Sequence, residues 1–130
     1  MDYKLEIGIG YTAEKIVKYE DTAVALGSGQ VKVFATPAMI LLMEEAALHA
    51  VQTVLPEGST TVGTSVNIQH LSATPEGKVV RATAALKEIN GKRLVFDVEA
   101  SDDKGIIGKG THERAIIDTE KFMQKLMQGE

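Results

Sequence analysis

The longest apolar stretch of the chain lies between residues 36 and 55 and has the pattern of one buried helix. It opens with Thr36 and Pro37, a hydroxyl residue that can cap a helix followed by a proline whose missing N–H costs nothing in the first turn. Apolar residues then occupy almost every face, and Pro56–Gly58 ends the run. We therefore predict a core helix over 36–55, shorter than a membrane span requires.

Most of the remaining chain has the pattern of strands. Asn90 and Gly91 form the strongest short signal for a β-hairpin. Residues 27–29 are glycine-rich and predict a flexible connection, and residues 118–127 predict a short C-terminal helix. The expected strands lie within 11–26 (one or two strands) and over 60–72, 78–89, 93–100 and 106–117.

One long buried helix followed by an antiparallel meander predicts an α+β fold. The apolar face of a single antiparallel sheet must be covered, and the 36–55 helix is the only element long enough to do so. We expect a curved antiparallel sheet wrapped around this central helix, in a single domain over residues 1–130. An edge strand of such a sheet stays open, which predicts a homodimer or a dimer of dimers.

Composition narrows the class of protein. The 130 residues include no cysteine, which excludes a thiol nucleophile and cysteine-based metal sites and agrees with a reducing compartment. Residues 1–6 lack the apolar core of a secretory leader, so we expect a cytoplasmic protein with no membrane partner. The net charge of −4, without a basic cluster, argues against nucleic-acid binding.

The predicted helix carries one carboxylate on its apolar side. Glu45, His49 and Gln52 share a polar stripe, whereas Glu44 lies about 100° away among apolar neighbours. Burial would raise the pKa of such a carboxyl and suit it to general-base chemistry. The other reading is that Glu44 pairs with a cation at a dimer interface, and the helix pattern leaves both readings open.

Two histidines lie on apolar strand faces. Alternation groups Val62, Val66, Ile68 and His70 on one face, so His70 is either a hydrogen-bonded core residue or a catalyst.

His112 shares its face with Gly108, Gly110 and Arg114, and we expect these glycines to make room for the central helix. No pair of histidines has the spacing of a metal motif, so no metal site is expected.

Several separated motifs match one known family in order and spacing. They are Val33–Thr36, Leu42–Glu44, Val62–Thr64, His70–Gly77 and Gly110–Arg114. From Val33 to Leu126 the chain resembles the fluoroacetyl-CoA thioesterase-like family of hot-dog proteins. The resemblance implies a hot-dog fold, a dimer, and hydrolysis of acyl-CoA thioesters without a metal or other cofactor.

The family resemblance also implies roles for particular residues. The catalytic threonine, glutamate and histidine fall on Thr36, Glu44 and His70. Substrate contacts fall on Gly63 and Arg114, with Phe34 as the aromatic residue of the pocket. Fluoroacetyl specificity is not expected, because the family's longer aromatic-rich stretch is here the short segment 25–30.

Two other functions stay open at this point. An acyl-thioester dehydratase or hydratase would use the same residue types, and a non-catalytic acyl-CoA-binding module would bind without turnover. The cations available for the phosphates of coenzyme A are Arg81, Lys87, Lys92, Arg93, Lys104 and Lys109.

The spacing of Thr36 and Glu44 raises a geometric problem. Residues eight apart on one helix are about 12 Å apart along its axis. Either the helix begins later than Thr36, or the site combines residues of two subunits.

Overall fold

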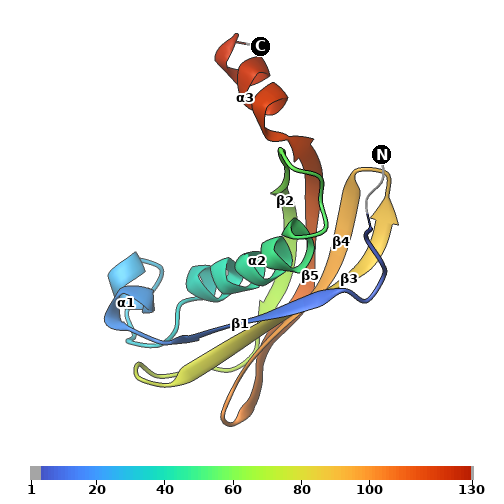
Figure 1. The fold of residues 1–130 in the computed structure, drawn as a ribbon. Helices are drawn as coiled ribbons and strands as arrows, with labels where there is room; N and C mark the ends of the chain where they lie inside the picture. The colour runs from blue at the N-terminus through green and yellow to red at the C-terminus, as the bar shows by residue number, and fades with distance from the viewer. Residues whose placement is uncertain (1–3, 130) are drawn as a thin grey trace.

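The computed structural model describes residues 4–129, so residues 1–3 and 130 of the predicted domain lie outside the described residues. Five antiparallel strands form one curved sheet in the order β1-β3-β4-β5-β2, with helix α2 across its inner face (Figure 1). The predicted hot-dog architecture is thereby confirmed. The strands are β1 (Gly10–Ile16), β2 (Ser59–His70), β3 (Val79–Asn90), β4 (Arg93–Asp102) and β5 (Gly105–Asp118).

Helix α2 (Thr36–Gln52) is the predicted core helix, three residues shorter at its C-terminal end than expected. Its sheet-facing side chains are fully buried, and small residues such as Ala82 and Ala84 line the sheet beneath it. A Cβ added at Gly108 would lie 2.5 Å from Sδ of Met39. Gly108 therefore makes room for the central helix, as predicted. The prediction was wrong for Gly110, because a Cβ there would meet the backbone of the neighbouring strand β2 and not the helix.

The segment before α2 contains one strand, within the predicted one or two, and the residues after that strand are helical. Only β1 is extended, and it is followed by a 3₁₀ turn, η1 (Tyr19–Asp21), and a short helix, α1 (Ala23–Leu26). The Asp21 carboxylate accepts the Lys18 N–H at 2.9 Å, and Thr22 Oγ1 accepts the Ala25 N–H at 3.3 Å. These local side-chain caps compete with strand pairing and determine the helical conformation.

Strand β2 contains a β-bulge that reverses its alternation. Gly63 pairs with Arg114 and Ser65 with Glu113, so Thr64 is the extra residue. Val66, Ile68 and His70 face the helix as predicted, but Val62 pairs with Ala115 on the outer face. The prediction for Val62 was wrong because one inserted residue shifts the side-chain period by one position.

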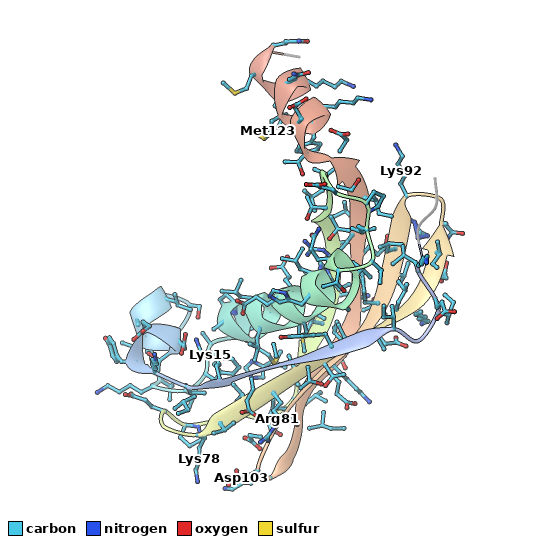
Figure 2. All side chains as sticks on the ribbon, in the orientation of Figure 1. Lys15, Lys78, Arg81, Lys92, Asp103 and Met123 are labelled. Carbon is cyan, nitrogen blue, oxygen red and sulfur yellow. The ribbon has the colours of Figure 1, made fainter. Side chains whose placement is uncertain are left out.

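The last helix, α3 (Thr119–Met127), begins at its cap Asp118, whose carboxylate accepts the Lys121 N–H at 3.0 Å. It extends away from the sheet, with Met123 on its exposed surface (Figures 1 and 2). Strands β1 and β2 are the two edges of the sheet. Within residues 4–129, no helix has the length and apolar character needed to cross a membrane.

Candidate active site

Thr36 and His70 meet where α2 begins and β2 ends. The Oγ1 atom of Thr36 lies 2.7 Å from Nδ1 of His70. Ala35, not Thr36, is the N-cap residue, because its carbonyl accepts the Met39 N–H at 2.9 Å. The prediction that Thr36 caps the helix was therefore wrong by one position. This shift leaves the Thr36 hydroxyl free to bind the histidine.

His70 is held in its neutral form. Burial lowers the pKa of His70 below its ordinary value of 6.5, and the backbone of Ser72 opposes this shift only in part. Within the described residues, Nε2 of His70 is buried and has no hydrogen-bond partner. A buried polar atom without a partner is uncommon, so Nε2 is suited to contact a ligand.

A cavity of about 300 Å³ adjoins this pair. Phe34, almost fully buried, forms part of its wall, so the expected aromatic residue is at the pocket. The other lining residues are mostly small and apolar: Ala23, Ser28, Val33, Ala35, Leu71, Ser72 and Ala73, with Thr36 and His70 among them. Such a cavity suits a small acyl group or part of a thioester arm better than a long chain.

Glu44 belongs to a second group, on the middle of α2. A Cβ at Gly63 would lie 3.1 Å from Glu44 Oε2, 3.3 Å from His112 Cε1 and 3.5 Å from Arg114 Nη1. The half-buried Glu44 thus faces Gly63 with two basic side chains beside it. Of the expected site residues, Glu44, Gly63 and Arg114 are brought together here.

Arg114 is buried and fixed by hydrogen bonds. Its Nε donates to Thr61 Oγ1 at 2.7 Å and its Nη2 to the Thr61 carbonyl at 3.0 Å. Burial lowers the pKa of this guanidinium, and the nearby Glu44 carboxylate counteracts the shift. Arg114 therefore remains a positive charge inside the protein, available to an electronegative ligand group.

Within a single chain, the Thr36–His70 pair and the group around Glu44 lie apart. Thr36 is the first residue of α2, so the alternative that the helix begins later than Thr36 is excluded. Thr36 and Glu44 are consequently about 12 Å apart along the helix axis.

Thr61, Ser65 and His112 also belong to the second group, although no role in a site was predicted for any of them from the sequence. The shared face of His112 and Arg114 was visible in the sequence, but their contacts depend on the bulge in β2. A glycine inside a strand pattern, as at position 63, was the one signal that could have indicated it.

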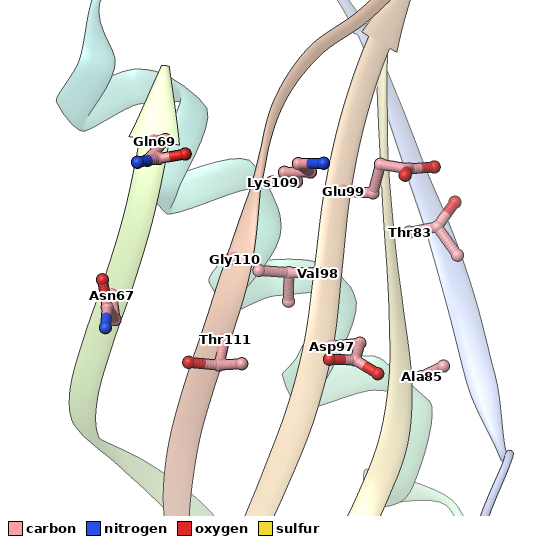
Figure 3. Close-up of a pocket in the computed structure, with 10 residues that line it drawn as sticks. All are labelled: Asn67, Gln69, Thr83, Ala85, Asp97, Val98, Glu99, Lys109, Gly110 and Thr111. Carbon is pink, nitrogen blue, oxygen red and sulfur yellow. The ribbon is translucent and has the colours of Figure 1, made fainter. Parts of the chain in front are cut away.

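A larger hollow of about 690 Å³ lies on the opposite, outer face of the sheet (Figure 3). Its exposed polar side chains, including Asp97, Glu99 and Lys109, alternate with residues that face α2. None of Thr36, Glu44, Gly63, His70 and Arg114 lines this hollow. No group of three or more His, Asp or Glu residues within 4–129 is arranged to hold a metal ion.

Comparison with known proteins identifies the class. The family model described as fluoroacetyl-CoA-specific thioesterase matches residues 17–120. A fluoroacetyl-CoA thioesterase of Streptantibioticus cattleyicolor is 44% identical over 97 residues, which are 75% of this chain and 70% of that protein. A solved structure of the fluoroacetyl-CoA thioesterase has a TM-score of 0.90 and 36% identity, covering 97% of this chain and 98% of that one.

A thioesterase superfamily member from Thermus thermophilus is also similar, with a TM-score of 0.87, 30% identity, and coverage of 95% and 91% of the two chains. Fold and comparisons together define a thioester hydrolase of the hot-dog class. Within that class, the chain belongs to the fluoroacetyl-CoA-specific thioesterase family. The resemblance seen in the sequence and the expected enzyme class are thereby confirmed.

Proposed function

We propose that this protein hydrolyses the thioester of a small acyl-CoA to the free acid and coenzyme A, without a metal or other cofactor. Thr36, Glu44 and His70 act as the catalytic residues, and Gly63, Arg114 and Phe34 bind the substrate. The observation that carries the proposal is the 2.7 Å contact of Thr36 with the half-buried, neutral His70 beside a cavity. Acyl transfer needs a hydrogen-bond donor fixed at the carbonyl oxygen, and a histidine held in place by a hydroxyl can supply one.

The active site in this proposal is shared between two copies of the chain. Thr36 and His70 of one copy work with Glu44, Gly63 and Arg114 of the other. An antiparallel pairing of the two β2 edges centred on Asn67 would place His70 opposite Gly63 of the second copy, because the bulge at Thr64 takes up one residue. Two sheets joined in this way also remove an open edge.

The proposed chemistry depends on which atoms of Thr36, His70 and Glu44 donate or accept a proton. If Thr36 donates its hydroxyl proton to Nδ1 of His70, then Nε2 carries a hydrogen that it can donate to the thioester carbonyl oxygen. In the general-base version, Glu44 takes a proton from water as the water oxygen bonds to the carbonyl carbon. The C–S bond then breaks, and the proton passes to the thiolate sulfur of coenzyme A. In the nucleophilic version Glu44 itself attacks, and water hydrolyses the resulting anhydride.

Fluoroacetyl-CoA is the substrate named for the relatives. For this chain we propose small acyl groups without a preference for fluorine. The segment 25–30, which precedes the Val33–Thr36 motif, contains no aromatic residue, and only Ser28 of that segment reaches the cavity. An aromatic lid over the acyl group is therefore missing from this part of the chain.

The wider setting is part of the same proposal. Residues 1–130 form one hot-dog domain that acts as a homodimer or a dimer of such dimers in the cytoplasm. The open β2 edge supports self-association, and the absence of cysteine agrees with a reducing compartment.

The test is release of free thiol from a panel of acyl-CoAs that differ in length and polarity and include fluoroacetyl-CoA. Wild type is compared with Glu44→Ala and His70→Ala. We expect turnover by wild type and its loss in both folded variants. Binding of acyl-CoA without thiol release on any substrate would contradict the proposal and favour a binding module. Conversion of an enoyl-CoA without thiol release would favour a hydratase.

A further inference from the structure

One member of a buried chain of hydrogen bonds in the second group, His112, has no role in the function proposed above. His112 Nδ1 lies 2.8 Å from the carbonyl oxygen of Ser65, and His112 Nε2 lies 3.1 Å from Nη1 of Arg114. Arg114 in turn donates to the side chain and the carbonyl of Thr61. Only 1% of His112 is exposed, so water does not compete for these bonds.

The partners of His112 determine which nitrogen carries its proton. A backbone carbonyl can only accept, so Nδ1 must donate to Ser65. A guanidinium can only donate, so Nε2 must offer its lone pair to Arg114. His112 is therefore neutral and in a single tautomer.

Its surroundings agree with this assignment. Burial lowers the pKa of His112, the Ser65 carbonyl opposes that shift, and the charge of Arg114 lowers the pKa further. The carboxylates of Glu44 on α2 and Glu113 on β5 act in the opposite direction.

The same bonds fix the plane of Arg114. Thr61 and His112 accept three of its five N–H groups, which leaves one on each terminal nitrogen. Among residues 4–129, no carboxylate forms an ion pair with Arg114 within 4.0 Å. Nη1 lies 3.5 Å from where a Cβ of residue 63 would stand, so the unused N–H of Nη1 borders the space that the glycine leaves open.

We propose that His112 is a positioning residue: locked by the Ser65 carbonyl, it accepts from Arg114 and orients the free N–H groups of that guanidinium toward the acyl end of the substrate beside Gly63. The bulge at Thr64 makes this arrangement possible. It places Gly63 on the inner face opposite Arg114, while the Ser65 carbonyl lies only two residues further along the strand. The inference rests on the proposed function, in which Gly63 and Arg114 contact the substrate.

A merely structural histidine would give different results in mutants. The ring of His112 also packs near Phe96, with centroids 6.4 Å apart, and any loss of that packing would change stability. A positioning role instead requires an acceptor that reaches Arg114. Two replacements separate the roles, because an asparagine amide can still donate to Ser65 but is too short to reach Arg114, whereas a glutamine can extend its oxygen to Nη1.

The first experiment measures kcat/KM for His112→Asn and His112→Gln with the best substrate of the panel. We expect a loss of about tenfold or more in His112→Asn and recovery of most of it in His112→Gln. His49→Asn, at an exposed histidine outside both groups, is the matched control and should retain wild-type activity. Wild-type activity in His112→Asn, or equal losses in both folded variants, would overturn the proposal.

A double-mutant cycle tests whether His112 acts through Arg114. Lysine cannot reproduce the planar fork of arginine, so Arg114→Lys should itself lower kcat/KM. We expect His112→Asn to add little further loss in the Arg114→Lys background. Fully additive losses would mean that His112 acts independently, contrary to the proposal.

The tautomer can be read without any turnover. Long-range ¹H–¹⁵N NMR spectra of the wild-type protein should show His112 protonated at Nδ1, with Nε2 as a hydrogen-bonded acceptor whose resonance moves in Arg114→Lys. Protonation at Nε2 instead would overturn the inference. Because this measurement uses the wild-type protein, it tests the inference even if His112→Asn does not fold. A protein with this tautomer but no thioesterase activity would contradict the proposed function and leave the orientation of Arg114 established.

Discussion

Oε2 of Glu44 lies 3.1 Å from the position that a Cβ would take at Gly63. The carboxylate and the glycine therefore occupy one compact space between α2 and β2, and a single added methyl group is enough to disturb it.

The variant Gly63→Ala tests this closeness. The φ angle of Gly63 is not in the positive region, so an alanine is tolerated by the backbone and the main effect falls on Glu44. We expect kcat/KM to fall by about tenfold or more with little change in melting temperature, because displacing Glu44 is costly if it is the proposed base or nucleophile. Thr64→Ala, at the neighbouring exposed residue, should behave as wild type. Full activity in Gly63→Ala would mean that Glu44 does not need this position.

A shared active site predicts complementation between two inactive variants. Glu44→Gln and His70→Asn are each expected to be inactive alone. In a mixed dimer, one site combines the intact His70 of one copy with the intact Glu44 of the other. With random mixing of the co-expressed chains, about a quarter of the wild-type activity should return, since half the dimers are mixed and each has one intact site. No recovery in dimers proven to be mixed would place each site within one chain.

The proposed pairing of the β2 edges predicts a specific disulfide. The chain has no cysteine, so an introduced one can be followed alone. A strand paired with itself about Asn67 brings the two copies of that residue directly opposite each other, within the Cα separation that a disulfide requires. Asn67→Cys should therefore form a covalent dimer under mild oxidation.

The same strand register also predicts which other cysteine positions should and should not cross-link. Ser65 would face Gln69 of the second copy, so neither Ser65→Cys nor Gln69→Cys should cross-link alone, but a mixture of the two should. Cross-linking by the single variants and not by Asn67→Cys would show a different register.

Asp21 fixes the chain ahead of helix α2 and should contribute to stability. Its carboxylate accepts from Lys15 Nζ at 2.7 Å and from the Lys18 N–H at 2.9 Å, and its own carbonyl accepts the Ala35 N–H at 2.9 Å. We expect Asp21→Ala to lower the free energy of unfolding by about 1–2 kcal/mol.

Asp103→Ala gives the matched comparison in urea unfolding. Asp103 pairs with Lys78 at 3.6 Å on an exposed surface at the β4–β5 turn, so its loss should cost less than about 0.5 kcal/mol (Figure 2). Equal effects of the two replacements would mean that the contacts of Asp21 are no stronger than those of a surface ion pair.

The buried His112 and the half-buried His70 should make the protein less stable as the pH falls below neutrality. Burial lowers the pKa of both His70 and His112 from 6.5, so below that pH the unfolded chain binds protons that the folded chain does not. Stability then falls as the pH drops through 6.5 toward the lowered values.

The measurement is the melting temperature between pH 7.5 and 5.5. We expect it to decrease over this interval in wild type and to decrease less in His70→Asn or His112→Asn. An unchanged pH dependence in both variants would mean that other groups take up the protons.

Elements with a strong period or a turn signal could be predicted from the sequence. The apolar run after Pro37 determines α2, and Asn90 and Gly91 determine the β3–β4 hairpin. The segment Tyr19–Leu26 could not be predicted as helical, since β-branched residues there favour strands and the helical turns depend on caps at Asp21 and Thr22.

The sequence indicated which residues to consider for the candidate site, but it did not indicate which of them contact one another. Family resemblance indicated Thr36, Glu44 and His70, but only the structure reveals that one chain pairs Thr36 with His70 and holds Glu44 elsewhere. The contact of His112 with Ser65 depends on the bulge at Thr64, which inverts the face of every residue before it and leaves no mark in the alternation pattern.

Helix α2 fixes both the separation and the relative orientation of Thr36 and Glu44. Substitutions along the helix can reshape the pocket one side chain at a time, but inserting one residue between these positions would rotate Glu44 by about 100° and shift it by about 1.5 Å. Insertions and deletions that change substrate specificity without moving Glu44 relative to Thr36 must therefore lie outside the helix. The exposed connection at 27–32, which reaches the cavity wall at Ser28, is the place where lengthening the chain leaves the separation of Thr36 and Glu44 unchanged.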